Sequence, residues 1–593
     1  MPSRRLLPLA IAFALASSAA IANPTDDKFD ALAARDWAFR LKEYPSLARE
    51  ENPDFVSSSL GDDSEAAQAR RHAFWLGVRK ELSAISEAEL SGSEKINYAI
   101  FRGQIDSFIA DYETGRYLMP INSDSTFYTY LPQLPTSQPF AKREHYAAYL
   151  AKLADFPRYF ANNQALLEAG IQRGMTVPQV VLAGRDAALR QHAEVKKPED
   201  SVYYAPFVKL PDWLSAKEQD ELRAKAKKVI ADQVIPTYQR FLGFFTKTYV
   251  PAARQSLGAY QLPGGKAFYQ AQIREYTTLD MAPEKIHALG MSEVKRIRGE
   301  MADIIREVGF KGSFEQFLTF LRTDPQFYAK TPRELLMHAR DIAKRIDNKL
   351  PSMFKMLPRQ PYGVEPVPAD IAASYTAGRY SGSPAGGLEA GHYWVNTTKL
   401  ESRPLYALPA LTLHEAVPGH HLQNALAAEQ GEQPAFRRTS YISAFGEGWA
   451  LYSEHLGVEM GIYETPYEQF GRLTYEMWRA CRLVVDTGIH AQGWTRDQAV
   501  AFMRDNTALS LHEINTEVDR YISWPGQALS YKLGELKIRE LRAKAEKTLG
   551  EKFDLRAFHD AILALGSVPL DVLEEQMNTW IAQQGALAGN KKD

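Results

Sequence analysis

Apolar side chains recur at helical spacing through most of the chain. Between residues 26 and 247 they return every three or four positions, which places them on one face of a helix. Alternation typical of strands is scarce in this part of the sequence. The pattern therefore predicts a mainly α fold, a large helical body. Two representative runs are Phe74, Val78, Leu82, Ile85 and Tyr98, Phe101, Ile105, Phe108, Ile109.

Two stretches rich in proline or glycine interrupt the helical pattern. Residues 117–139 contain four prolines among Ser, Thr and Tyr, so we expect a long ordered loop of the kind that often lines a cleft. The sequence Pro263-Gly264-Gly265 predicts a lobe boundary near residues 250–270. The chain is long enough for two or three lobes, and we divide it into an N-terminal helical region, 23–260, and a second region, 261–593.

Residues 351–400 depart from the helical pattern because Pro and Gly are interleaved with short apolar runs. Within them, His392 to Thr397 alternates as a strand does, and such a strand could offer a free edge to an extended peptide. A structural edge strand without a ligand fits the same pattern. We therefore expect a small strand-containing segment beside the helices. Helices are expected at 282–308, 313–322, 331–350 (capped by Thr331), 445–460, 467–490, 495–503 and 514–549, the last broken at Pro525-Gly526.

The N-terminus has the pattern of a secretory signal. Arg4 and Arg5 precede a short apolar run, and small residues follow up to Ala22, which predicts cleavage near that residue and excludes residues 1–22 from the fold. An uncleaved anchor is the alternative, but the run is shorter than the roughly 20 residues that span a bilayer. The only cysteine, Cys481, is far from the signal and excludes both an intramolecular disulfide and a lipidated N-terminal Cys. We expect a periplasmic or secreted protein.

The charge balance of the chain limits the kinds of partner that we expect. The chain has 70 basic and 72 acidic residues and a formal net charge of -2, which gives no reason to expect nucleic acid or an acidic membrane as a partner. No further segment predicts stable membrane insertion. Recognition must then be local, and the sequence leaves the oligomeric state undefined.

The stretch from Leu411 to Gln423 predicts a metal site. His414 and Glu415 are adjacent, and His420 and His421 follow within two helical turns. Neutral imidazoles bind zinc, and a neighbouring carboxylate can activate water as a general base. We therefore assign His414 as a ligand and Glu415 as the base.

The second histidine ligand depends on the local backbone. A regular helix would bring His421 to the face of His414, but Pro418 and Gly419 favour a bulge that would bring His420 round instead. We choose His420, and the geometry leaves His421 open. The third ligand is expected from a separate helix at Glu447, and Glu454, two turns further along, could orient a ligand histidine. A surface carboxylate is the alternative for both.

The pattern His-Glu-x-x-Pro-Gly-His-His, followed by Glu-Gly-Trp-Ala-x-Tyr-x-Glu, resembles the bacterial domain-of-unknown-function family 885, which is grouped with the gluzincin-like metallopeptidases. The resemblance covers most of residues 370–540. It implies a mainly helical fold and a zinc-dependent peptidase site with His414 and His420 as ligands, Glu415 as base and Glu447 as third ligand. The His spacing is two residues longer than in the commonest zinc motif. Other matching pieces are Tyr393 to Thr397, Arg479 to His490 and Trp524 to Gly534.

Peptide hydrolysis also needs donors for the oxyanion that develops on the scissile carbonyl. The run from Trp524 to Tyr531 resembles the tyrosine-bearing segment of helical carboxypeptidases and oligopeptidases, so Tyr531 is the leading donor, with Tyr521 and His490 behind it. Arg479 and Arg482 could each hold a substrate carboxylate or form an ion pair with Asp486 or with a Glu of a neighbouring helix; we favour the ion pair for Arg482 and leave both alternatives open for Arg479.

The combined expectation is a periplasmic or secreted zinc metallopeptidase with one zinc ion, its catalytic region in residues 261–593, that hydrolyses oligopeptides with Glu415 as general base. A metallohydrolase acting on a non-peptide amide or ester is the alternative within enzymes, because the same site does not choose its acyl substrate. A protein that binds metal or peptide without turnover is the alternative outside them. Cleavage at a terminus or inside the peptide is left open.

Overall fold

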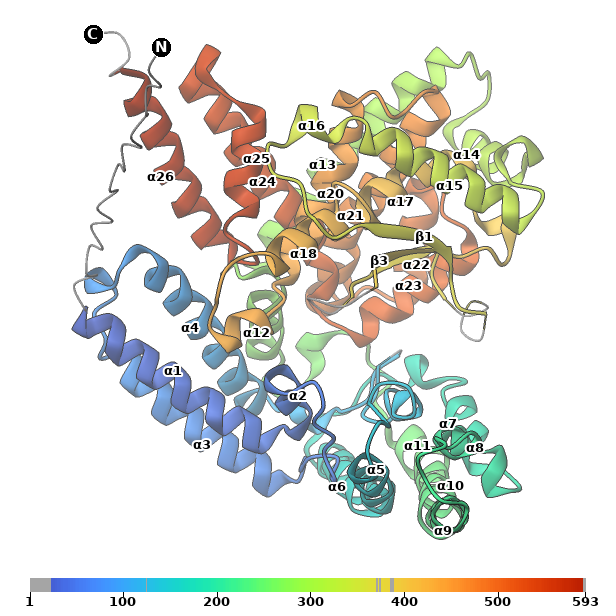
Figure 1. The fold of residues 1–593 in the computed structure, drawn as a ribbon. Coiled ribbons are helices and arrows are strands. Elements are labelled where there is room, and N and C mark those ends of the chain that lie inside the picture. The colour runs from blue at the N-terminus through green and yellow to red at the C-terminus, as the bar shows by residue number, and fades with distance from the viewer. Residues whose placement is uncertain (1–22, 124, 370–371, 373–374, 384–388, 590–593) are drawn as a thin grey trace, which may run out of the picture.

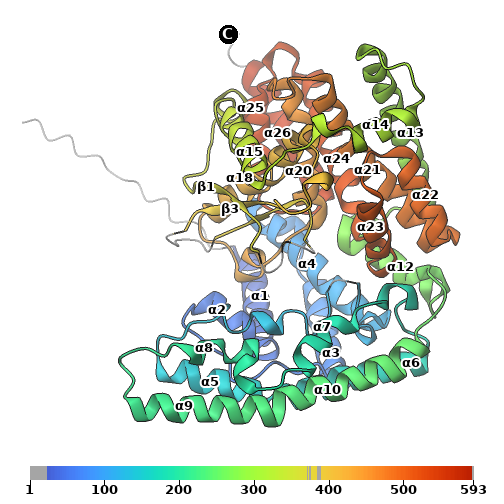
Figure 2. The ribbon, with the colours of Figure 1, turned by 90° about the vertical axis from the view of Figure 1, so that its right-hand side faces the viewer.

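The computed structural model describes residues 23–123, 125–369, 372, 375–383 and 389–589, and the predicted signal, residues 1–22, lies outside this part. The fold is mainly α, as the periodicity predicts, with one three-stranded sheet among the described residues. Figures 1 and 2 show the N-terminal helices, blue to green, packed below the later helices, yellow to red. Buried apolar side chains from Phe29 to Ile581 form one continuous core through both parts.

The N-terminal part is a set of helices separated by short turns. Residues 117–139 hold short 3₁₀ turns and one isolated bridge between Ile121 and Thr126, which agrees with the predicted ordered loop. The helices are α1 (Pro24–Glu43), α2 (Ala48–Glu51), α3 (Glu65–Leu82), α4 (Gly92–Glu113), α5 (Arg143–Ala154), α6 (Phe156–Arg173), α7 (Asp186–Ala193), α8 (Ala205–Val208), α9 (Ala216–Val229), α10 (Ile235–Phe244) and α11 (Val250–Ala252).

The second part is built around long buried helices. The predicted cap is present, since the Thr331 side chain accepts a hydrogen bond from the Glu334 amide at the start of α15. The helices are α12 (Gly265–Thr277), α13 (Pro283–Glu307), α14 (Phe314–Thr323), α15 (Pro332–Asp347), α16 (Leu350–Met353), α17 (Leu408–Glu415), α18 (His420–Ala428), α19 (Ala435–Arg438), α20 (Ser443–Glu459), α21 (Pro466–Gln492), α22 (Arg496–Asn506), α23 (Leu511–Ser523), α24 (Ser530–Leu549), α25 (Leu555–Leu563) and α26 (Leu570–Gly589).

The small sheet lies in the predicted strand-containing segment, just before α17. Its strands are β1 (Tyr362–Pro366), β2 (Gly378–Ser381) and β3 (Gly391–Val395), in the order β1-β3-β2. The expectation that the strand around His392 offers a free edge is wrong, because β3 is central and is paired on both sides. Alternation along a strand reports which residues are buried and does not report how many neighbours the strand has.

Helices α20 and α24 touch at their backbones. A Cβ atom added at Gly448 would lie 2.5 Å from the backbone of Gly534, closer than real contacts allow. The missing side chains let the two helices cross in direct contact. Because Glu447 precedes Gly448 and Tyr531 lies one turn before Gly534, the crossing brings these two residues to the same place. None of the described helices is long and apolar enough to cross a membrane.

Candidate metal centre

The stretch from Leu411 to Gln423 is not one helix. Helix α17 ends at Glu415 and α18 begins at His420, so residues 416–419 form a turn that includes a cis Val417–Pro418 peptide bond. The indole Nε1 of Trp449 in α20 donates a 2.8 Å hydrogen bond to the Pro418 carbonyl oxygen. This bond ties the turn to the helix that carries Glu447. The tryptophan of the Glu-Gly-Trp-Ala motif therefore positions the break between the two histidines.

The break brings His414, His420 and Glu447 together. Glu447 Oε2 lies 3.5 Å from His414 Nε2 and 3.4 Å from His420 Nε2. One ligand atom from each of the three residues lies within 4.8 Å of the others. The two imidazole rings are 4.9 Å apart and nearly perpendicular, with an interplanar angle of 89°. Three side chains from three helices thus converge on one point.

This donor set fits a zinc ion. Two ligand atoms about 2.0–2.1 Å from a tetrahedral zinc lie roughly 3.3 Å apart, close to both measured separations from Glu447. Two histidines and one glutamate are also a known ligand set of catalytic zinc sites, which keep one position open. The spacing and the chemistry of the three side chains are therefore those of a metal centre with room for a fourth ligand.

Carboxylates dominate the electrostatics of this centre. Burial works to lower the pKa of His414, but hydrogen bonds with Glu447 and Glu454 raise it to about 10. Burial likewise works to raise the pKa of Glu447, but hydrogen bonds with His414 and His420 hold it well below its usual range. The carboxylates favour positive charge at this point. A cation would replace the protons on the imidazoles and satisfy the same carboxylates.

Glu454 has the orienting position that the sequence suggested. It is 1 % exposed, and its Oε1 accepts a 2.8 Å hydrogen bond from His414 Nδ1, which turns His414 Nε2 toward Glu447. A carboxylate in this position fixes the tautomer of a ligand histidine and raises its basicity. Arg479 Nη2 lies 3.5 Å from the same Oε1 atom, so Arg479 is an ion-pair partner of Glu454.

Glu415 and His421 lie on either side of β2. Glu415 Oε2 accepts a 2.8 Å hydrogen bond from the backbone amide of Tyr380 in this strand. His421 points elsewhere, with Nε2 3.1 Å from the Gln360 carbonyl oxygen and Nδ1 3.2 Å from the Tyr380 hydroxyl. The bulge therefore places His420 at the cluster and leaves His421 as a support of β2.

Tyr531 lies near the cluster with a free hydroxyl. Its ring stacks under the guanidinium groups of Arg482 and Arg479, at 4.2 Å and 5.8 Å from the ring centroid. The hydroxyl forms no hydrogen bond within the described chain, although the residue is only 8 % exposed. Arg482 pairs with Glu517 of α23 at 2.9 Å, which agrees with the expected ion pair to a neighbouring helix.

The other two donor candidates are used elsewhere. The Tyr521 hydroxyl donates to Glu517 and accepts hydrogen bonds from Arg482 and Trp478. His490 Nδ1 accepts from the Ala259 amide at 3.2 Å, and its Nε2 lies 2.9 Å from the Tyr521 carbonyl oxygen. The hydrogen-bonding groups of both side chains are already paired, so neither Tyr521 nor His490 is available as a donor to an oxyanion.

Two residues near the centre were missed by the sequence reasoning. Arg379 of β2 has a raised pKa, since Tyr375, Glu415 and Glu447 together outweigh its burial. The Tyr441 ring packs against Gly446, and desolvation of its hydroxyl, with Glu447, Tyr531 and Glu415, raises its pKa. Neither residue belongs to the quoted motifs. Arg379 lies within strand β2, and Tyr441 lies shortly before the motif that begins at Glu447, so closeness along the chain was the one signal for either residue.

The fold and the cluster together define a mainly helical protein with a two-histidine, one-glutamate centre. The family model for bacterial proteins of unknown function, DUF885, matches residues 47–577, so the chain belongs to that family. A protein of Colwellia psychrerythraea, provisionally described as a lipoprotein, has a crystal structure with a TM-score of 0.86 and 28 % identity, over 94 % of this chain and 99 % of that chain.

A protein of Shewanella oneidensis, described in the same provisional way and as of unknown function, matches with a TM-score of 0.67 and 20 % identity, over 93 % of this chain and 99 % of that chain. At this identity the likeness concerns the fold alone. The comparison with curated proteins found no match. The family and its solved relatives thus define the architecture and leave the activity to be argued from the site.

Proposed function

We propose that the protein is a zinc-dependent metallopeptidase that hydrolyses oligopeptides. The observation that carries the proposal is the convergence of His414, His420 and Glu447 from three helices, with Glu415 beside them. The similarity of the motifs to gluzincin-like peptidases supports the same reading. When bound, a zinc ion would lower the pKa of a coordinated water toward about 7 and polarise the scissile carbonyl.

Glu415 has the position of a general base. One of its oxygens is held by the Tyr380 amide at 2.8 Å, which fixes the direction of the carboxylate. The other oxygen forms no hydrogen bond within the described chain and is free to take a proton from water and to pass it to the leaving nitrogen. A purely structural zinc site would need four ligands and no such free carboxylate.

Two tyrosines could donate to the oxyanion. The hydroxyls of Tyr531 and Tyr441 form no hydrogen bond in the described part of the chain, and Tyr441 lies close enough to Glu447, Tyr531 and Glu415 for their charges to act on its hydroxyl. A tyrosine hydroxyl keeps its proton at neutral pH, so Tyr441 can donate it in a hydrogen bond. Tyr531 is held in place by the two arginines that cover its ring.

The strand β2 could bind the substrate backbone. Its partner β3 lies on one side, and the Tyr380 amide, which reaches Glu415, points to the other side. The edge of β2 that pairs with no other described strand therefore faces Glu415. An extended peptide that paired with this edge would place its backbone beside Glu415. This assigns to β2 the edge that the sequence had suggested for the strand at His392.

The test is mass spectrometry of a diverse synthetic peptide pool after incubation with residues 23–593 and zinc, beside the Glu415→Gln variant. We expect cleavage by the wild type and a loss of roughly 10²–10⁴-fold in the variant, which keeps its metal. The fragment ends would show whether cleavage is terminal or internal. No cleavage by protein that carries stoichiometric metal would favour a non-peptide amide or ester, and no turnover of any acyl substrate would favour a binding protein.

We also propose that the chain is exported. The N-terminal pattern ending near Ala22 supports this, as does the provisional description of both structural relatives as lipoproteins. The mature protein should begin near Asn23. Sequencing of the N-terminus of protein recovered outside the cytoplasm would test this, and an intact Met1 would contradict it.

A further inference from the structure

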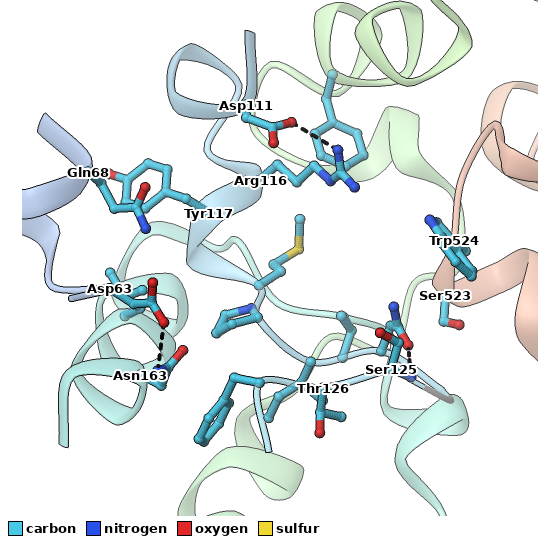
Figure 3. A pocket seen from close by; sticks show the side chains of 18 of the residues that line it. Asp63, Gln68, Asp111, Arg116, Tyr117, Ser125, Thr126, Asn163, Ser523 and Trp524 are labelled. Carbon is cyan, nitrogen blue, oxygen red and sulfur yellow. Dashed lines mark hydrogen bonds and ion pairs between the residues drawn. The ribbon is translucent and has the colours of Figure 1, made fainter. Parts of the chain in front are cut away.

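A cavity of about 470 Å³ lies where the N-terminal part meets the segment that leads into α24. Figure 3 shows its lining: the start of the 117–139 loop crosses the middle, and Ser523 and Trp524 close one side. This volume falls within the roughly 300–1,000 Å³ of small-ligand pockets. Trp524 begins the run that ends at Tyr531, and only Tyr531 at the end of this run lies near the candidate metal centre.

One wall of the cavity presents hydrogen-bond acceptors that have few or distant partners within the described chain. Figure 3 shows Gln68, Asp63 and Asn163 along this wall. Asp63 lies 3.4 Å from Asn163 Nδ2 and 3.9 Å from Arg71 Nη1, also interacts with the Tyr159 hydroxyl, and has a side chain that is 28 % exposed. Asn163 is 1 % exposed, and neither its Oδ1 nor the Gln68 side chain has a hydrogen bond within the described chain.

These acceptors match an ammonium group. A primary ammonium carries one positive charge and three N–H donors, and the wall offers a carboxylate and two amide oxygens. Asn163 is buried, whereas Asp63 and Gln68 are half-buried, so a ligand ammonium can reach all three and add a hydrogen bond to each of them. The charge of Asp63 would be compensated at the same time.

The remaining lining includes two arginines that do not use all of their N–H donors within the described chain. Arg116 forms two hydrogen bonds, to Asp111 at 3.0 Å and to the Tyr276 hydroxyl at 3.1 Å, of the five it can donate. Arg254 donates to the backbone carbonyls of Thr176, Ser256 and Gly258 and has no ion pair with a described carboxylate. Its charge is therefore not neutralised. Both guanidinium groups line the cavity, so each could pair with a carboxylate that enters it.

The space between these groups is aromatic and apolar. Tyr117 stacks on Tyr112, with ring centroids 4.9 Å apart, and Trp524 donates its indole N–H to Tyr276 on the side of Arg116. Met119 and Phe127 also line the cavity. Such a surface accommodates apolar side chains, whereas the two charged ends fix orientation.

We propose that this cavity is a second binding site, for a zwitterionic amino acid or short peptide, whose ammonium group binds Asp63, Asn163 and Gln68 and whose carboxylate lies toward Arg116 and Arg254. None of these residues belongs to the metal centre. The site is therefore independent of whether the protein hydrolyses peptides.

The test begins with native mass spectrometry of the Glu415→Gln protein with a pool of free amino acids and unmodified dipeptides, so that no probe is consumed. The best binder is then compared by isothermal titration calorimetry with its N-acetyl and C-terminal amide derivatives. We expect each modification to weaken binding by about 10–100-fold, the effect of losing a charge-assisted contact. Equal affinity of all three forms, or no binder in the pool at millimolar concentration, would overturn the proposal.

Variants locate the binding. Asp63→Asn should weaken the unmodified ligand by about 10–100-fold and leave its N-acetyl derivative unchanged, because only the former carries the ammonium. Gln68→Leu removes a side chain that has no partner in the described chain, so it should weaken binding without changing the melting temperature. Asp212→Asn, an exposed aspartate of the same region, is the matched control. Affinity that is unchanged in both Asp63→Asn and Gln68→Leu would place the ligand elsewhere and contradict the proposal.

Discussion

Two fully buried histidines of this protein have opposite surroundings. His414, 3 % exposed, meets carboxylates: Glu454 holds Nδ1, and Nε2 faces Glu447. His490, 0 % exposed, meets only backbone, with the Ala259 amide at one nitrogen and the Tyr521 carbonyl at the other. The pKa of His414 is raised to about 10, whereas burial lowers that of His490 to about 3.

The difference shows what distinguishes a chemical site from a structural one. Both histidines lie in helices, and both were candidates by sequence. In His414, one nitrogen is oriented by the Glu454 carboxylate and the other faces Glu447. In His490, both nitrogens are already hydrogen-bonded to backbone groups. The same contrast separates Tyr531, with a free hydroxyl, from Tyr521, whose hydroxyl has three partners.

The strongest test of the contrast removes each histidine. His414→Ala should reduce bound zinc from about one ion per chain to near zero and abolish hydrolysis, because a three-ligand site loses a ligand. His490→Gln should keep metal and activity. Inductively coupled plasma mass spectrometry and the peptide assay measure both. Full metal content in His414→Ala would show that the cluster does not bind zinc.

The two tyrosines should separate activity from stability. Tyr531→Phe removes a free donor, so kcat should fall by roughly 10²–10³-fold at unchanged stability. Tyr521→Phe leaves Arg482, Trp478 and Glu517 without their common partner and should cost about 1–3 kcal/mol of unfolding free energy with activity retained. Steady-state kinetics and urea unfolding distinguish them. If Tyr521→Phe lost activity and Tyr531→Phe lost only stability, Tyr531 would be excluded as a donor.

A smaller effect is expected from the group that orients His414. Glu454→Gln should weaken zinc binding by roughly 10–100-fold without abolishing it, because the histidine keeps its place but loses the carboxylate. Glu459→Gln, on the same helix and paired with Arg542, is the matched control. Competition with a zinc chelator gives the affinities. Equal affinities in the two variants would mean that Glu454 has no role at the centre.

The last expected effect concerns the pH dependence of stability and leaves metal binding and activity aside. The folded-state pKa of His490, about 3, lies below the unfolded value of about 6.5, so the unfolded chain takes up a proton that the native chain cannot. Its contribution to stability is complete above pH 6.5 and is lost as the pH falls toward 3, by at most about 1.4 kcal/mol per pH unit. His490→Gln cannot titrate there, so its unfolding free energy should decline less steeply in this range. If the unfolding free energies of the wild type and of His490→Gln fell equally with pH, His490 would not be the group that takes up the proton on unfolding.

The sequence predicted most of the fold because helical periodicity is a local property. It also predicted that His414 and Glu447 would lie in one cluster, which the structure shows, whereas the role of Glu415 as a base stays a prediction. The physical argument from Pro418 and Gly419 favoured a bulge, and the structure places His420 at the cluster through that bulge.

What the sequence could not supply depends on packing between distant segments. The pairing of β3 on both sides requires β1 and β2, which its own alternation does not encode. Arg379 and Tyr441 reach the centre from segments whose local sequence has no metal-site pattern. The cavity walls come from residues separated by hundreds of positions, so only the folded chain brings Asp63 and Trp524 together.

The contact of Gly448 with Gly534 has a consequence for motion and for sequence change. Two helices that touch through their backbones have no flexible side chains between them to absorb relative movement. Glu447 and Tyr531 therefore keep a fixed separation, and any opening of the protein around a substrate must occur at other elements, such as β2. An alanine at either glycine would push the helices apart and alter the ligand and the tyrosine in one step.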